Sequence, residues 1–212
     1  LTNLAVLLHA RGDYAEAEPL LRKATAIWRS VLGEDHPHVG VSLDNIGSLV
    51  NAQGEYAEAE ALHREGLEIA SAALGEEHPA VARILNNLAH VLENQGDYDG
   101  AEPPLRRALE INRGILGNEH AETALNLNNL AHLLQAKGDY EAAEPLYREA
   151  LDIRLRTLGE GHVSVSNSQS NLASLVEARG DAEQALALDE KPLAIRRDRR
   201  GSGSAAVAHQ YD

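Results

Sequence analysis

The chain has 212 residues, of which 43% are hydrophobic and only 3% aromatic, and it carries a formal net charge of −14. This acidic balance argues against general binding to nucleic acid backbones, and no apolar run approaches the roughly 18 residues of a membrane span. Without cysteine the chain has no disulfides and no thiolate metal sites. This fits a reducing compartment, so we expect a cytoplasmic location. The chain begins at Leu1 and contains no methionine, so we expect it to be part of a longer protein.

Five glycines that lie 42 residues apart mark an internal repeat. They open the segments "GDYAEAEPLLRKA", "GEYAEAEALHREG", "GDYDGAEPPLRRA", "GDYEAAEPLYREA" and, less regularly, "GDAEQALALDEKP". A constant period of this size is typical of repeat proteins. We therefore expect one array with repeats at about 1–39, 40–81, 82–123, 124–165 and 166–199, followed by a flexible tail at 200–212. The glycines are Gly12, Gly54, Gly96, Gly138 and Gly180.

Each repeat begins with the pattern of a short helix. In the fourth repeat, apolar residues recur at the i, i+3, i+4 and i+7 spacing of one helix face, at Leu127, Leu130, Ala131 and Leu134. The glycine that follows suits the left-handed conformation that ends a helix. We expect the first of these short helices to be truncated.

A longer helix is predicted next, from about Tyr14 to Val31 and at the equivalent positions of the other repeats. Asp13 is a good N-cap residue, and Glu16 would complete a capping box with it. One small-residue position per repeat lets two helices approach closely. The predicted buried stripe of the first long helix consists of Tyr14, Ala17, Leu21, Ala24 and Ile27.

A loop such as "LGEDHPHVG" closes each repeat, and its proline (Pro37 or Pro79) suits the first turn of the next helix. Each loop histidine is alone, about 10 Å from the next, whereas zinc ligands lie ~2 Å from one shared ion. We therefore expect these histidines to act at helix starts rather than in a metal site. They are His36, His78, His120 and His162. The whole pattern predicts an all-α, right-handed α-solenoid of ten helices in five helix-turn-helix pairs, with the shorter helices lining a concave face.

These motifs resemble a tetratricopeptide repeat (TPR) array. The 42-residue unit with "LNNLA", "GDYEAAEPLYREAL" and "LGEEHP" is similar to the kinesin light chain-like type, and the resemblance extends from residue 1 to about 195. The fifth repeat departs from the pattern at Ala182 and Pro192, so we expect its last helix to be kinked or broken near Lys191.

One asparagine recurs at the same position of every short helix, and this ladder is the candidate peptide-binding site. A carboxamide both donates and accepts hydrogen bonds, so it can hold a peptide backbone whatever the side chains are. The family resemblance implies such contacts to cargo peptides. The alternative is that these residues tie neighbouring helices together, and both roles stay open. The ladder consists of Asn3, Asn45, Asn87, Asn129 and Asn171.

Variable residues around the ladder are the candidate specificity positions. They are Arg83, Asn86, His90, Asn94, Asn128, His132 and Gln135. Kinesin light chain-like domains favour acidic peptides that contain tryptophan, which suits a basic groove. This chain offers one clear groove arginine, Arg83, together with several acids, and so departs from that pattern.

No phosphate-binding loop, H-E-x-x-H or G-x-S-x-G motif occurs, so we expect no enzyme activity, no cofactor and no metal. The carboxylates Glu16, Glu18, Glu58 and Glu60 are interpreted as a solvated helix face, and the basic run 196–200 as a solvated helix end. We predict a non-catalytic interaction module that binds a peptide or protein segment in its concave groove, with no nucleic acid or membrane partner. Two alternatives are self-association through the solenoid ends and a sensor arm of a larger signalling ATPase or effector.

Overall fold

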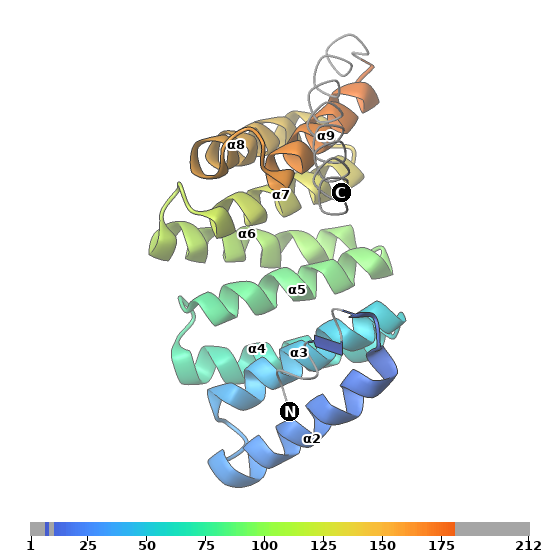
Figure 1. Cartoon of the computed structure of the whole chain (residues 1–212), viewed down its shortest axis with the longest axis vertical. Coiled ribbons are helices and arrows are strands. Elements are labelled where there is room, and N and C mark those ends of the chain that lie inside the picture. The colour runs from blue at the N-terminus through green and yellow to red at the C-terminus, as the bar shows by residue number, and fades with distance from the viewer. Residues whose placement is uncertain (1–6, 9–10, 181–212) are drawn as a thin grey trace, which may run out of the picture. The chain divides into compact units, whose positions relative to one another are not determined.

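A computed structural model describes residues 7–8 and 11–180 (Figure 1). This part of the chain forms eight α-helices and no strand. Of the first predicted helix only residues 7–8 are described, and they are helical. The tenth predicted helix, the substitutions at Ala182 and Pro192, and the predicted tail lie outside the described residues. The helices are α2 (Tyr14–Leu32), α3 (Pro37–Gln53), α4 (Tyr56–Leu74), α5 (Pro79–Gln95), α6 (Tyr98–Leu116), α7 (Ala121–Ala136), α8 (Tyr140–Leu158) and α9 (Val163–Ala178).

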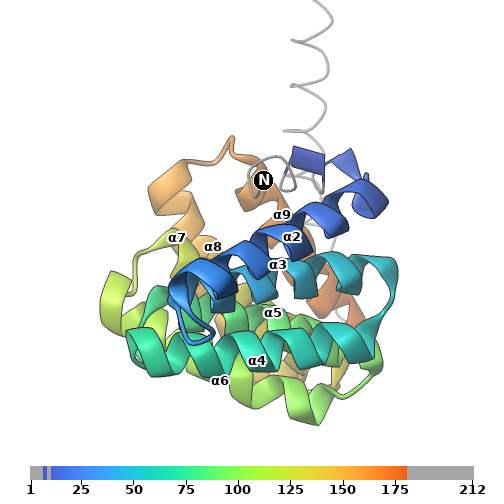
Figure 2. The same ribbon diagram turned by 90° about the horizontal axis from the view of Figure 1, so that it is seen from below.

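The chain divides into two compact units, Leu1–Ile115 and Leu116–Asp212. In the first unit α2 packs against α3, α3 against α4 and α4 against α5, and α3 also contacts α5 (Figures 1 and 2). In the second unit α7 packs against α8, α8 against α9, and α7 contacts α9. We call α3, α5, α7 and α9 the A helices, and α2, α4, α6 and α8 the B helices.

The loop histidines cap the A helices, as the sequence predicts. The Nδ1 atom of each accepts a hydrogen bond from the backbone N–H two residues later, at 3.1 to 3.2 Å. Pro37 and Pro79 occupy the first helical turn, where a missing N–H costs nothing. At the other end of α3 and α5, Gly54 and Gly96 adopt φ values of 90° and 81°, a conformation that glycine tolerates without steric cost.

The B helices are capped less uniformly than predicted. Asp97 and Asp139 each accept a hydrogen bond from the backbone N–H three residues later, at 2.9 and 3.1 Å. Asp13 makes no side-chain capping bond, so the capping box predicted for Asp13 and Glu16 is wrong. The backbone of residue 13 still accepts the first bonds of α2, which is enough to start the helix.

Alanine fills the predicted small-residue position of the B helices, and Ala17, Ala59, Ala101 and Ala143 are all fully buried. The predicted stripe of α2 is wrong at one position, because Ile27 is 43% exposed. In α6 the equivalent Ile111 is fully buried in a cluster with Val81 and Ala82 of the preceding helix α5. No helix among the described residues covers Ile27 as α5 covers Ile111.

Candidate functional site

The predicted ladder lies on the A helices, one asparagine per helix. Asn45 is on α3, Asn87 on α5, Asn129 on α7 and Asn171 on α9, and all four are half-buried. Asn3 lies outside the described residues. We call the half-buried and exposed side of α3 and α5 in the first unit, and of α7 and α9 in the second, the A-helix face of each unit. It carries the other predicted site residues, namely Arg83, Asn86, His90, Asn94, Asn128, His132 and Gln135.

Two ladder asparagines connect neighbouring A helices. Asn87 Nδ2 donates to Asp44 Oδ1 at 3.0 Å, and Asn171 Nδ2 donates to Asn128 Oδ1 at 2.9 Å. Both bonds reach back 43 positions, to the residue that precedes the previous ladder asparagine. The role of tying neighbouring helices together is therefore present within each unit. It uses one N–H of the amide and leaves its oxygen available.

Other predicted site residues also make contacts within their unit. Asn94 Nδ2 donates to Asn51 Oδ1 at 3.0 Å. Gln135 accepts a hydrogen bond from the Tyr147 hydroxyl at 3.0 Å. Asn86, His90, Asn129 and His132 each have interactions of their own as well. Asn45 differs from them, because within the described part of the chain its carboxamide has no hydrogen-bond partner.

The A-helix face of the first unit is built around the carboxylate of Asp44, which is fully buried. Its Oδ1 accepts hydrogen bonds from His63 Nδ1 at 2.9 Å and from Asn87 at 3.0 Å. Its Oδ2 pairs with the Arg83 guanidinium, whose side chain is 44% exposed. The buried charge therefore has three donors, as a buried carboxylate requires.

His63 projects from α4 and is as deeply buried as Asp44. Within the described residues its Nε2 has no hydrogen-bond partner. A methyl group at position 47 would lie 2.9 Å from both Cε1 and Nε2 of this ring. Gly47 on α3 therefore makes the space that the imidazole occupies.

Sequence reasoning missed the Asp44–His63 pair, although the repeat register contained a signal for it. His63 occupies the position of Leu21, Leu105 and Tyr147, and Gly47 occupies the position of alanine in the third, fourth and fifth repeats. In the second repeat, three positions therefore differ together from the later repeats: histidine replaces a core residue, glycine replaces the alanine opposite it, and Asp44 stands where the later repeats have asparagine or serine. Comparing the repeats with one another position by position would have revealed it.

The acidic side chains of the B helices pair with arginines on the surface, in agreement with their interpretation as a solvated face. Arg22 of α2 contacts Glu18 and Glu58 at 2.8 and 2.5 Å. Its hydrogen bonds to Glu58 and then Glu18 raise its pKa further above the ordinary arginine value. Hydrogen bonds from Arg64 and then Gln95 lower the pKa of Glu60. Such exposed pairs contribute little stability each.

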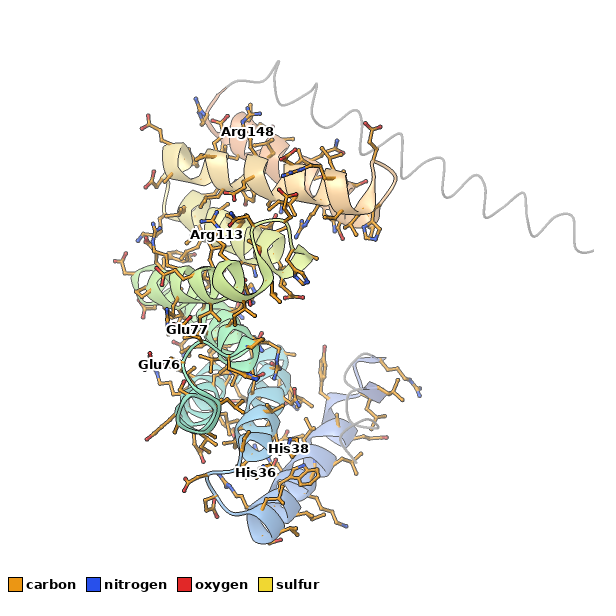
Figure 3. All side chains as sticks on the ribbon, turned by 90° about the vertical axis from the view of Figure 1, so that its left-hand side faces the viewer. His36, His38, Glu76, Glu77, Arg113 and Arg148 are labelled. Atoms are coloured by element: carbon orange, nitrogen blue, oxygen red, sulfur yellow. The ribbon has the colours of Figure 1, made fainter. Side chains whose placement is uncertain are left out.

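Two further groups stand out on the described helices. Burial lowers the pKa of the Arg154 guanidinium, which donates to Ser168 Oγ at 2.6 Å. Trp28 and His38 lie with ring centroids 5.1 Å apart, and His38 neighbours His36 where α3 begins (Figure 3).

In the described part of the chain no three His, Cys, Asp or Glu side chains are placed to hold a metal ion. No helix there is long and apolar enough to cross a membrane.

The sequence profile of the tetratricopeptide repeat matches residues 1–72, 42–114, 80–154 and 120–198. The chain belongs to the tetratricopeptide repeat family. Its helices therefore form a TPR solenoid, and the predicted all-helical TPR fold is confirmed. The five repeats and ten helices of the prediction remain unconfirmed, since eight helices lie in the described residues.

Solved structures of kinesin light chain-like TPR proteins are similar to this chain. BtubC (BKLC) from P. vanneervenii has 29% sequence identity and a TM-score of 0.82, over 93% of this chain and 79% of that one. A putative kinesin light chain from Podosopora anserina, with nearly identical TPR-like repeats, has 28% identity and a TM-score of 0.79, over 93% and 94%. The predicted kinesin light chain-like type is thus confirmed.

The apo form of RapI shares the TPR fold at 16% identity, with a TM-score of 0.80 over 97% of this chain and 72% of that one. At this identity the likeness shows the fold alone. No protein of curated function matches the sequence of this TPR chain.

Proposed function

We propose that this TPR chain is a non-catalytic interaction module that binds an extended peptide or protein segment on the A-helix face of its units. TPR membership supports a protein-interaction scaffold in general. The observation that carries the specific proposal is the pair Asn87 and Asn171, half-buried carboxamides on this face whose Oδ1 atoms accept no hydrogen bond inside the described chain. A polar group in this position gains by pairing with a ligand, because its hydrogen-bonding capacity is otherwise unused.

The spacing of the ladder fits an extended ligand. Adjacent packed helices lie about 8–10 Å apart, and an extended chain advances about 3.3 Å per residue. Equivalent side chains would then meet every third residue of the ligand. The tying role does not conflict with this, because Asn87 and Asn171 use one amide N–H for the neighbouring helix and keep Oδ1 for a ligand N–H.

The test is a displayed peptide library screened against the parent chain and against Asn45→Ala. Asn45 is the preferred ladder position, because its replacement removes no hydrogen bond among the described residues and should leave their fold intact. The matched control is Asn118→Ala, which removes an exposed carboxamide from the loop between α6 and α7.

We expect the parent and Asn118→Ala to enrich the same peptides. Asn45→Ala should bind them about 5- to 30-fold more weakly, the loss typical of about 1–2 kcal/mol for one hydrogen-bonding group. If Asn45→Ala binds the peptides as tightly as the parent chain does, the ladder does not contact the ligand. No enrichment by any of the three proteins would contradict peptide binding itself.

A second candidate function is self-association through the α2 end of the first unit. It is favoured by Ile27, which is 43% exposed although the same position is fully buried in α6. An apolar side chain at a position built for helix packing offers a second copy a surface to cover.

A further inference from the structure

We propose that the A-helix face of the first unit selects a segment without net negative charge, read through its backbone carbonyls by Arg83 and Asn45. This rests on the proposed function, since it names the chemistry of the partner at the same site. The observation behind it is that the charge of Arg83, the arginine predicted to line the groove, is already compensated from inside the protein.

The compensation is built into the fold. Asp44 is fully buried and pairs through Oδ2 with Arg83, which reaches back from α5 to α3. Solvent ions cannot screen a carboxylate at this depth as they screen a surface charge. Arg83 is therefore the permanent counter-ion of Asp44, and its release to a ligand carboxylate would leave a buried charge unpaired. Breaking a buried pair in this way is strongly unfavourable.

His63 also belongs to this cluster. Its Nδ1–H donates to Asp44 Oδ1, while its Nε2 is buried without a partner in the described chain. Besides this histidine, the cluster holds one carboxylate, Asp44, and one guanidinium, Arg83.

The other charged residues of α3 and α5 do not make this face positive. Besides histidine, α3 and α5 contain one arginine and two acids, Asp44 and Glu93, and no lysine. The whole chain has a formal charge of −14, which repels acidic ligands at a distance. An incoming carboxylate meets a neutral pair on an acidic protein.

Hydrogen-bonding capacity nevertheless remains at the surface. A guanidinium has five N–H donors, and Arg83 uses one nitrogen for Asp44 while its side chain stays 44% exposed. Asn45 follows Asp44 directly in the chain, and its carboxamide has no hydrogen-bond partner among the described residues. These groups suit peptide carbonyls, which accept hydrogen bonds without carrying a full charge.

The test uses three displayed peptide pools of equal length, one acidic, one neutral and one basic, with the parent chain and Asp44→Asn. The variant keeps the shape of the side chain and removes the charge that compensates Arg83. Asp152→Asn is the matched control, because it makes the same change of net charge at an exposed position of α8.

We expect the parent and Asp152→Asn to enrich the neutral or basic pool over the acidic one. Asp44→Asn should gain about two- to fivefold in affinity for acidic peptides, the effect of one uncompensated, half-exposed cation. Preference of the parent for the acidic pool would overturn the inference while leaving peptide binding intact. Absence of enrichment from all pools would instead overturn the proposed function and this inference with it.

A measurement on the parent alone keeps the proposal falsifiable if Asp44→Asn does not fold. The best enriched peptide is compared with derivatives that carry added glutamates or added lysines, at low and high salt. We expect the glutamate derivative to bind more weakly than the starting peptide and to recover as salt screens the repulsion. Tighter binding of the glutamate derivative at low salt would overturn the proposal.

Discussion

The carboxylate of Asp44 joins three helices of the first unit through hydrogen bonds to its two oxygen atoms. It belongs to α3, receives His63 from α4, and receives Arg83 and Asn87 from α5. Removing one partner of such a buried charge typically costs 3–5 kcal/mol, because the remaining charge stays buried. The cluster therefore restricts which residues can stand together at positions 44, 47, 63 and 83, and these residues shape the A-helix face of the first unit.

Gly47→Ala tests how closely this cluster is packed. The new methyl group would lie 2.9 Å from the His63 ring, so we expect the free energy of unfolding to fall by about 1–3 kcal/mol. Gly114→Ala is the control, because Gly114 lies in α6 with nothing within 4 Å of the added methyl group. It should be neutral or stabilising by up to about 1 kcal/mol.

Urea denaturation of both variants gives the comparison, and His63→Leu provides a second background. Leucine stands opposite alanine in the third repeat, at Leu105 and Ala89. The cost of Gly47→Ala should therefore shrink once position 63 is leucine. A cost that is unchanged in this background would show that the His63 ring is not what limits position 47.

At the scale of the helix, the A helices share one device for starting. A histidine precedes each of them and its Nδ1 accepts the N–H of the second helical residue. Side-chain acceptors at this position satisfy one of the N–H groups that a helix leaves unpaired at its first turn. Because this bond recurs in each repeat, every A helix begins at the same position of its repeat.

His120→Ala removes this cap from α7, and we expect it to cost about 0.5–2 kcal/mol. His120→Asn should retain most of the stability, since asparagine is itself a favourable N-cap residue. Urea denaturation, together with amide hydrogen exchange in the first turn of α7, measures both variants. Equal stability and equal protection for the alanine variant would show that water replaces the histidine without loss.

The sequence predicted the helices and their boundaries better than it predicted which side chains are buried or which polar side chains are in contact. Helix boundaries followed from glycine, proline and histidine positions, because these act through the local backbone. The predicted burial of Ile27 was wrong, because burial of this position depends on a neighbouring helix rather than on the periodicity of α2 itself. The Asp44–His63 contact was missed for a similar reason. It joins residues 19 positions apart, and no local spacing rule relates them.

At the scale of the whole molecule, the candidate end surface at Ile27 makes a separate prediction about association. If a second copy covers this position, the parent chain should show concentration-dependent mass in sedimentation, and Ile27→Glu should abolish it, because the charge would be buried at the contact. Ala26→Glu puts the same charge on an exposed neighbour in α2 and should leave association unchanged. A parent chain that stays monomeric at all concentrations would contradict this second function.

The central claim is that the ligand lies on the A helices, and hydrogen exchange in the presence of an enriched peptide tests it most directly. The amides of each helix are compared with and without saturating peptide, helix by helix within the first unit. We predict that protection increases in α3 and α5, around Asn45 and Arg83, and stays unchanged on the exposed side of α4. Protection confined to α4, or spread evenly over all helices, would contradict the account.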